Sequence, residues 1–194
     1  MLAAHAGVET LRLRDSLFAE ISGVASPVGV LAVIAIPAEA TGPLTESCVL
    51  LEGIQDAGNV GTILRTAAAA GVRDVVLGPG CAGAWTMRVL RAAQGAHFGL
   101  ALREAGDLAS VVRDFGGLSV ATVADHATPL YALDLRGPVA WIFGNEGAGV
   151  SPELAAAAKV RATIPMASGS ESLNVAAAAA VCLFEAQRQR LMGG

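Results

Sequence analysis

The sequence predicts an α/β fold, a parallel sheet flanked by helices. From about residue 28 onward, short β-branched runs alternate with Ala-rich amphipathic stretches. The β-branched runs are apolar throughout rather than alternating, which is typical of parallel strands covered on both faces. Apolar residues make up 54% of the 194 residues and charged residues only 15%, so much of the chain must be buried.

Seven apolar runs are expected to be strands, and five stretches between them to be helices. The strands are VGVLAVIAI (28–36), SCVLLEG (47–53), DVVLGP (74–79), FGLAL (98–102), LSVATV (118–123), VAWIFGN (139–145) and VRATIPM (160–166). The helices are expected near residues 60–70, 85–94, 106–114, 152–158 and 172–190.

Two of these helices carry start and stop signals. Asn59 is expected to cap the first helix, and Gly71 to end it. Ser151 is expected to cap the fourth, with Pro152 in the first turn, where proline is tolerated. Arg65 lies off the apolar stripe of the first helix and should face solvent.

Composition excludes several classes of protein. A net charge of −4 argues against nonspecific nucleic-acid binding over a broad basic surface, although a local basic patch remains open. Three scattered cysteines without CxxC spacing predict neither a metal site nor a disulfide. No apolar run is long enough to cross a bilayer and no signal peptide is recognisable, so a cytoplasmic protein is expected.

Three motifs lie where predicted strands end: LEGIQDAGNVGTILRTAAAAGV (51–72), IFGNEGAGVSPEL (142–154) and IPMASGSESLNVAAAAAVCLFEAQRQR (164–190). Taken singly, each is explained as well by a capped helix or a turn as by a ligand. Together they predict a binding site, because open parallel sheets place ligands at the carboxyl ends of their strands. The usual glycine-rich dinucleotide and P-loop patterns are absent, so the ligand is expected to be of another kind.

The three motifs, in this order, resemble those of the SpoU (TrmH-type) RNA ribose 2′-O-methyltransferases of the SPOUT superfamily. The likeness rests on N-x5-R in the first motif, on FGNEGAGVS, on IPM…ESLNVAAAAA and on the intervening RVLRAAQGAHF. It extends from about residue 28 to residue 190. It implies S-adenosylmethionine as the methyl donor and a C-terminal half tied into a deep trefoil knot.

The resemblance also implies which residues form the site. The catalytic set is Asn59, Arg65, Glu146, Ser172 and Asn174. The cofactor-binding set is Thr122, Gly144, Asn145, Gly147, Ile164, Met166, Ser172 and Leu173. Small residues in the loops, among them Gly169 and Ser170, would allow the close backbone contacts that a knot requires.

Roles follow for four of these residues. Gly144 is expected to let the loop backbone lie against the cofactor, and Asn59 and Glu146 are expected to orient Arg65. A guanidinium is not normally a base, so Arg65 is expected to bind the adjacent phosphate and stabilise the developing alkoxide. The second motif (142–154) contains no lysine or arginine, which suits binding of a positively charged sulfonium donor better than binding of a pyrophosphate.

RNA is the expected partner, ribosomal RNA rather than tRNA, contacted by Arg65, Arg88 and Arg91. A homodimer is expected as well, because the final helix is apolar on nearly every side. Residues 1–27 are interpreted as an N-terminal segment or the remnant of an RNA-binding domain, and residues 28–194 as the catalytic domain. The alternative is a catalytically inactive RNA-binding or ribosome-assembly factor on the same scaffold.

Overall fold

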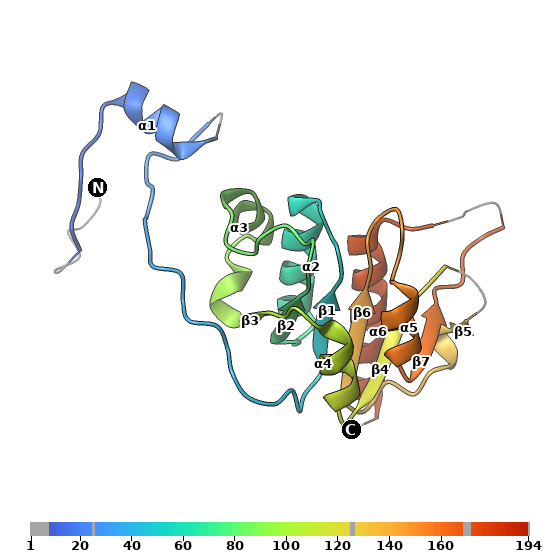
Figure 1. Cartoon of the computed structure of the whole chain (residues 1–194). Coiled ribbons are helices and arrows are strands. Elements are labelled where there is room, and N and C mark those ends of the chain that lie inside the picture. Colours follow the sequence, from blue (N-terminus) through green and yellow to red (C-terminus); the bar gives the residue numbers. More distant parts are fainter. Residues whose placement is uncertain (1–7, 25, 125–126, 169–171, 194) are drawn as a thin grey trace. The chain divides into compact units, whose positions relative to one another are not determined.

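The computed structural model describes residues 8–24, 26–124, 127–168 and 172–193 (Figure 1). The chain divides into two compact units, Met1–Pro37 and Ala38–Gly194. The first contains one helix in its described part, α1 (Asp15–Ser22), which ends at Gly23 in the left-handed conformation, with φ of 62°.

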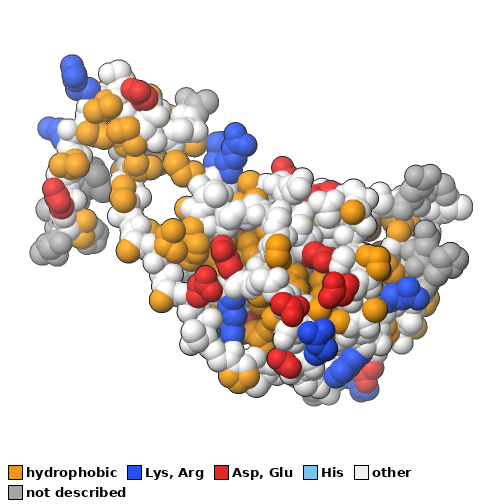
Figure 2. Space-filling model, in the orientation of Figure 1, with side chains coloured by type: hydrophobic (Ala, Val, Ile, Leu, Met, Phe, Trp, Pro, Cys, Tyr) orange, Lys and Arg blue, Asp and Glu red, His pale blue; other side chains and the backbone are white. Residues whose placement is uncertain are grey.

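The run Val28–Ile36 is not a strand, so this prediction is wrong. Its β-branched residues favour an extended backbone, but a strand also needs a partner for its N–H and C=O groups. The run pairs with no strand of the described chain, and Val28 and Val33 are 91% and 93% exposed. Hydrophobic side chains accordingly gather on the visible surface of the unit that contains α1 (Figure 2). A functional domain that begins at residue 28 stays a prediction.

A seven-stranded parallel sheet forms the second unit, in the order β3-β2-β1-β6-β4-β7-β5. The strands are β1 (Cys48–Leu51), β2 (Asp74–Leu77), β3 (Ala101–Glu104), β4 (Leu118–Thr122), β5 (Thr128–Pro129), β6 (Val139–Phe143) and β7 (Val160–Thr163). Five of them lie within predicted runs, whereas β3 overlaps the predicted run 98–102 only at its last two residues, because Phe98 and Gly99 lie in a 3-10 helix (Ala96–Gly99). The seventh, β5, was not expected, and its proline restricts it to the edge position that it occupies.

Helices cover both faces of this sheet, as predicted (Figure 1). Side chains alternate along the buried strands: Leu51 and Phe143 pack with one set of helices, whereas Leu50 and Ile142 pack with the other. The first set is α2 (Ala57–Ala69), α3 (Met87–Ala93) and α6 (Val175–Met192), and the second is α4 (Leu108–Asp114) and α5 (Pro152–Ala157). Two short 3-10 helices are η1 (Ala96–Gly99) and η2 (Leu130–Ala132).

The cap of α2 corrects another expectation. Asp56, not Asn59, caps this helix: its Oδ1 accepts a hydrogen bond of 2.7 Å from the backbone N–H of Asn59. The helix therefore starts one turn earlier than predicted, and the side chain of Asn59 is left available for other contacts. Gly71 follows the helix end at φ of 75°, and Ser151 caps α5 ahead of Pro152, both as expected.

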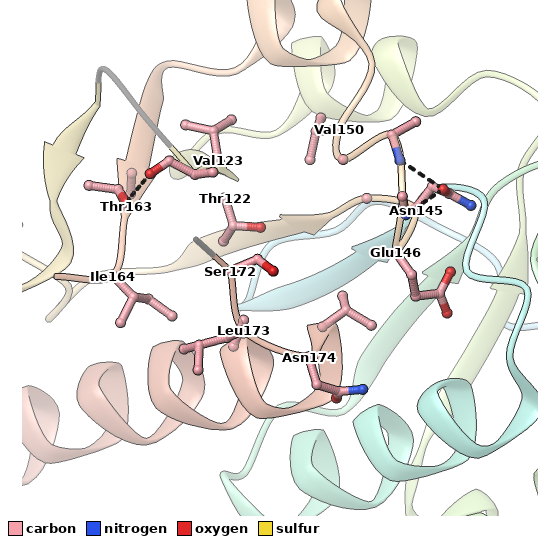
Figure 3. Close-up of a pocket in the computed structure, with 18 of the residues that line it drawn as sticks. Thr122, Val123, Asn145, Glu146, Val150, Thr163, Ile164, Ser172, Leu173 and Asn174 are labelled. Carbon is pink, nitrogen blue, oxygen red and sulfur yellow. Dashed lines mark hydrogen bonds between the residues drawn. The ribbon is translucent and has the colours of Figure 1, made fainter. Parts of the chain in front are cut away.

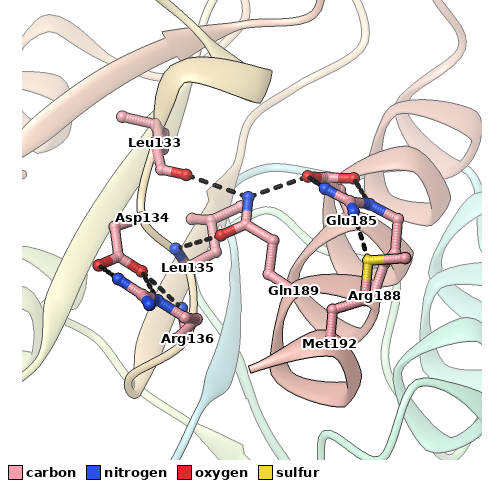
Figure 4. Close-up of polar contacts among 8 residues, drawn as sticks. All are labelled: Leu133, Asp134, Leu135, Arg136, Glu185, Arg188, Gln189 and Met192. Carbon is pink, nitrogen blue, oxygen red and sulfur yellow. Dashed lines mark hydrogen bonds and ion pairs between the residues drawn. The ribbon is translucent and has the colours of Figure 1, made fainter. Parts of the chain in front are cut away.

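The far end of α6 is fastened to the loop that precedes β6 (Figure 4). Gln189 accepts a hydrogen bond of 2.9 Å from the backbone N–H of Leu135 and donates one of 3.0 Å to the carbonyl of Leu133. Glu185 accepts a third bond, of 2.9 Å, from the same amide. These bonds fix α6 against the sheet, and thereby fix the position of its N-terminal end. None of the helices in the described residues combines the length and hydropathy needed to span a bilayer.

Candidate functional site

A pocket of about 550 Å³ opens at the carboxyl ends of β4, β6 and β7, beside the N-terminus of α6 (Figure 3). All eight residues of the predicted cofactor set line it: Thr122, Gly144, Asn145, Gly147, Ile164, Met166, Ser172 and Leu173. Three of the five predicted catalytic residues line it too, namely Glu146, Ser172 and Asn174. Gly169 and Ser170 lie outside the described residues.

The loop that follows β6, residues 144–149, folds tightly back on itself, and we call it the glycine loop. A Cβ atom at Gly144 would lie 2.2 Å from the carbonyl carbon of Gly149 and from the backbone nitrogen of Val150, far closer than real side chains approach. The sequence interpretation assigns this glycine to cofactor contact, and the structure adds a second requirement, from the loop itself. Gly144 is therefore needed to form the pocket wall before any ligand arrives.

Asn145 shapes the same loop with both ends of its amide. Its Nδ2 donates to the carbonyl of Gly53 at 2.8 Å, which ties the loop to the chain after β1. Its Oδ1 accepts from the backbone N–H groups of Gly147 and Ala148 at 2.9 and 3.0 Å. The side chain of Asn145 thus holds the backbone of the pocket wall in place.

A second tie to the same loop was not predicted from the sequence. The carboxylate of Glu52 accepts hydrogen bonds from the Ser151 hydroxyl at 2.6 Å and from the Ser151 backbone N–H at 2.7 Å. A signal for it was present, because Glu52 is an acidic residue directly after the fully buried strand β1. The loop is therefore fastened at its start through Asn145 and at its end through Ser151.

Residues from all three motifs meet at the rim of the pocket. Asn174 Nδ2 donates to Asn59 Oδ1 at 3.0 Å, and Asn59 Nδ2 donates to Glu146 Oε1 at 3.0 Å. Asn174 also caps α6, since its Oδ1 accepts from the backbone N–H groups of Ala176 and Ala177. This network depends on the earlier start of α2, which leaves the Asn59 side chain free for it.

The Glu146 carboxyl is held in its ionised form. Burial raises its pKa, but hydrogen bonds from the Asn59 amide and from backbone N–H groups, including that of Asp56, outweigh burial and lower the pKa below its ordinary value. At neutral pH the rim of the pocket therefore carries a negative charge.

Thr122 and Leu173 differ in how they face the pocket. The Thr122 hydroxyl donates to the carbonyl of Ile142 at 2.9 Å, so it links β4 to β6. Leu173 is 42% exposed, which leaves apolar surface on the pocket rim. Thr122 thus forms part of the pocket wall with its hydroxyl already bonded to Ile142, whereas Leu173 offers an apolar contact to a ligand.

The predicted cations lie apart from the pocket. Arg65 is exposed on α2, six residues or about 9 Å along the helix from Asn59. Within the described residues, no hydrogen bond joins Arg65 to Asn59 or Glu146. The contacts by which these two residues were expected to orient Arg65 are therefore not formed in this structure. Arg88 and Arg91 are both exposed on α3, which packs beside α2.

The chemistry of the lining narrows the kinds of ligand. Glu146 is the one ionisable side chain among the lining residues of the described chain, and the rest are apolar, small or uncharged polar residues. A phosphate would find no cation there, whereas a cationic ligand would meet a carboxylate. The described residues also contain no group of three or more potential metal ligands.

The comparisons with known proteins agree with this geometry. The model of the SpoU rRNA Methylase family matches residues 46–184. The 23S rRNA (guanosine(2553)-2′-O)-methyltransferase RlmP of Bacillus subtilis is 33% identical over 180 residues, which cover 92% of this chain and 72% of that protein.

Two solved structures share the fold. The AdoMet-bound rRNA methyltransferase of Sinorhizobium meliloti superposes with a TM-score of 0.79 at 32% identity, covering 90% of this chain and 70% of that one. The SpoU methyltransferase AviRb of Streptomyces viridochromogenes, in complex with the cofactor AdoMet, gives a TM-score of 0.69 at 30% identity, covering 78% and 64%.

Proposed function

The chain belongs to the SpoU rRNA methylase family, and we propose that it transfers a methyl group from S-adenosylmethionine to a ribose 2′-hydroxyl of ribosomal RNA. The observation that carries this proposal is the pocket at the strand ends, lined by every residue of the cofactor set and bordered by the network of Asn174, Asn59 and Glu146.

The pocket suits S-adenosylmethionine in size and charge. Its volume of about 550 Å³ lies within the range of sites for ligands of this size. Ile164, Met166 and Leu173 supply apolar contacts for an adenine ring, and the glycine loop presents backbone groups at close range. Glu146 supplies the negative charge that favours a sulfonium or an α-amino group over a phosphate.

The reaction makes two demands on the protein. An O–CH₃ bond forms as an S–CH₃ bond breaks, and the hydroxyl proton is lost to water or a base. Because a sulfonium is already a good donor, the chain mainly has to align the ribose and stabilise charge on its oxygen. We assign alignment to the network around Asn59, and charge stabilisation and phosphate binding to Arg65.

The direct test is incubation of the full chain with tritiated S-adenosylmethionine and ribosomal RNA transcripts, followed by digestion and mass analysis of the nucleosides. A 2′-O-methylated nucleoside is expected. The competing function, an inactive RNA-binding or assembly factor on the same scaffold, predicts RNA binding without any methylated nucleoside. Incorporation of label into transfer RNA alone would contradict the assignment to ribosomal RNA.

A trefoil knot in the C-terminal region is part of this proposal. Family membership supports it, as does the close packing at Gly144, where backbone meets backbone with no room for a side chain. An experimental density map that traces residues 142–175 continuously tests it. A knot requires one part of this range to pass through a loop formed by another part of the chain.

A homodimer built on α6 is the last part of the proposal. The helix buries one stripe, and Phe184 on another side is 46% exposed although it is large and apolar. Exposed apolar surface of this kind in a helix that is otherwise packed favours contact with another copy. We expect the two-fold interface to include α6.

A further inference from the structure

The surface formed by α3 and η1 combines cations with exposed apolar side chains. Phe98 in η1 is 89% exposed, and Met87 and Leu90 on α3 are also exposed. Arg88 and Arg91 are exposed on the same helix, one turn apart and thus on one side of it. We call these five residues the α3 surface: Met87, Arg88, Leu90, Arg91 and Phe98.

Positive charge is concentrated in this part of the fold. The chain as a whole has 17 acidic and 13 basic residues, yet residues 57–99 contain a single acid, Asp74, against arginines at positions 65, 73, 88 and 91. The Asp74 carboxylate is already paired with Arg103, at 2.7 Å. No ion pair in the described part of the chain neutralises Arg65, Arg88 or Arg91.

Close packing of two helices joins the α3 surface to Arg65. A Cβ atom at Gly61 of α2 would lie 2.4 Å from the Cβ of Ala92 and 2.7 Å from the carbonyl oxygen of Val89, both on α3. Arg65 follows Gly61 by one turn, on the same side of α2. The cation assigned to the reaction therefore lies on the side of α2 that packs against α3.

The exposed ring of Phe98 indicates what kind of polyanion fits. Unpaired nucleotides offer bases that stack on aromatic side chains, while their phosphates contact arginines. A duplex hides its bases, so it would use the arginines and leave Phe98 exposed. Phe98 is also the most exposed aromatic side chain of the described residues, at 89% against 58% for Tyr131 and 46% for Phe184.

Self-association is a poorer explanation for this surface. A two-fold contact centred on this surface would place the same patch of both copies face to face, which would bring the arginines of the two copies close together. Like charges facing each other in a contact are unfavourable. No acidic residue on α3 or η1 offsets them.

We propose that the α3 surface binds an unpaired stretch of the RNA substrate, with Phe98 stacking on a base and with Arg88 and Arg91 contacting phosphates. The proposal rests on the proposed function, since it names the part of the chain that holds the RNA beside Arg65. It assigns Phe98 a contact that depends on single-stranded structure rather than on charge.

Binding of labelled oligoribonucleotides to the full chain tests this proposal. The probes are a short mixed-sequence single strand and the same sequence as a duplex, each titrated at salt concentrations from about 50 to 200 mM. Phe98→Ala should weaken single-strand binding about tenfold at every salt concentration, and Phe98→Trp should restore it. Duplex binding should change little in either variant.

The arginines should give a different signature. In the double variant R88A/R91A, the slope of log affinity against log salt for the single strand should fall in magnitude by about 1.4, the value for two lost phosphate contacts. Tyr131→Ala and Arg113→Ala are the matched controls: both side chains are exposed, on η2 and α4, outside the α3 surface. Neither should alter affinity or slope.

Several outcomes would overturn the proposal. It fails if Phe98→Ala binds the single strand as tightly as Tyr131→Ala, or if it loses single-strand and duplex binding equally. It also fails if Phe98→Ala changes the mass in light scattering, since the ring would then belong to a protein interface. Methylation of ribosomal RNA by a chain whose α3 surface does not bind RNA would refute the surface and leave the proposed function intact.

Discussion

Asn59 donates a hydrogen bond of 3.0 Å to Glu146 across 87 residues of sequence, and this bond joins the helix after β1 to the glycine loop after β6. The amide oxygen of Asn59 accepts a hydrogen bond from Asn174, which fixes the orientation of this amide. Each amide accepts on one side and donates on the other, so the chain of bonds runs in one direction and ends on a carboxylate. The rim of the pocket is thereby set by three segments that are far apart in sequence.

The ionisation of Glu146 leads to a prediction about pH. Burial raises its pKa, but the bonds from Asn59 and the backbone lower it overall. A carboxyl whose pKa is depressed in the folded protein stabilises the fold above its unfolded pKa, and this stabilisation is lost as pH falls through the folded pKa. The negative charge that a cationic ligand would meet is lost over the same pH range. Affinity for S-adenosylmethionine, measured by calorimetry, should therefore be steady near neutral pH and fall only below the ordinary carboxyl range of about pH 4.

Asn59→Ala should move this acid limb to higher pH, because it removes the strongest of the bonds that lower the pKa of Glu146. Thr62→Ala, at an exposed position of the same helix, serves as the control and should leave the limb in place. An unchanged midpoint in Asn59→Ala would show that ionisation of Glu146 does not govern cofactor binding.

Removal of the Glu52 carboxylate should loosen the glycine loop. Glu52→Ala deletes two hydrogen bonds to Ser151, of 2.6 and 2.7 Å, and should cost about 2 kcal/mol in the free energy of unfolding measured with urea. Cofactor affinity should fall as well, while Glu52→Gln should recover part of both. Glu104→Ala, at the exposed end of β3, is the control, and equal losses in Glu52→Ala and Glu104→Ala would contradict the role of this tie.

Gly144→Ala should disrupt the pocket wall, because the added methyl group meets the backbone of Gly149 and Val150 at 2.2 Å. Backbone atoms cannot rotate away, so the loop must shift, at a cost of about 1–3 kcal/mol and with loss of cofactor binding. Gly137→Ala is the control, since nothing lies within 4 Å of its Cβ position. Thermal unfolding and calorimetry report the two effects; normal cofactor affinity in Gly144→Ala would disprove the need for this close contact.

Arg65→Ala should reduce methyl transfer by about a hundredfold or more while cofactor affinity stays close to that of the wild type. The side chain is exposed and lies outside the pocket, so stability should change by less than about 0.5 kcal/mol. Single-turnover transfer to ribosomal RNA measures the rate, with Arg113→Ala on α4 as the control. Turnover near the wild-type rate would make Arg65 an ordinary surface cation.

The parts of the fold that follow from local pattern were predictable from the sequence. Apolar runs such as Val139–Phe143 have the composition of buried parallel strands, and Ser151 followed by Pro152 is a helix start that neighbouring residues alone determine. The pocket was predictable for the same reason. Once the strand ends are known, parallel topology brings the loops that follow them to one edge of the sheet.

Contacts between distant segments were not predictable in this way. Val28–Ile36 has the composition of a strand, but pairing depends on a free neighbouring edge that composition does not reveal. Both Asp56 and Asn59 are good capping residues, and only the contact with Glu146 shows why Asn59 belongs inside the helix. The bond from Ser151 to Glu52 spans 99 residues, and although the position of Glu52 after a buried strand indicates a polar contact, it does not identify Ser151 as the partner.

The exposed side of α6 leads to the last prediction, that the chain forms a homodimer. The final helix was expected to be buried on more than one side, and within one chain it buries a single stripe: Ala176, Ala179, Cys182, Leu183 and Ala186. Phe184 lies off this stripe and is 46% exposed. Leu191, near the end of the helix, is also exposed.

A second copy would cover this side of α6, and stable interfaces of this kind bury more than about 1,200 Å² in total. Light scattering of the full chain should therefore give about twice the chain mass of 19.5 kDa. Phe184→Asp should shift the mass to that of the monomer, because it places a charge in the middle of an apolar contact. Tyr131→Asp, at a 58% exposed aromatic residue on η2, should leave the dimer intact. A monomeric wild-type chain that methylates RNA would refute the pairing, and a Phe184→Asp variant that remains dimeric would place the interface elsewhere.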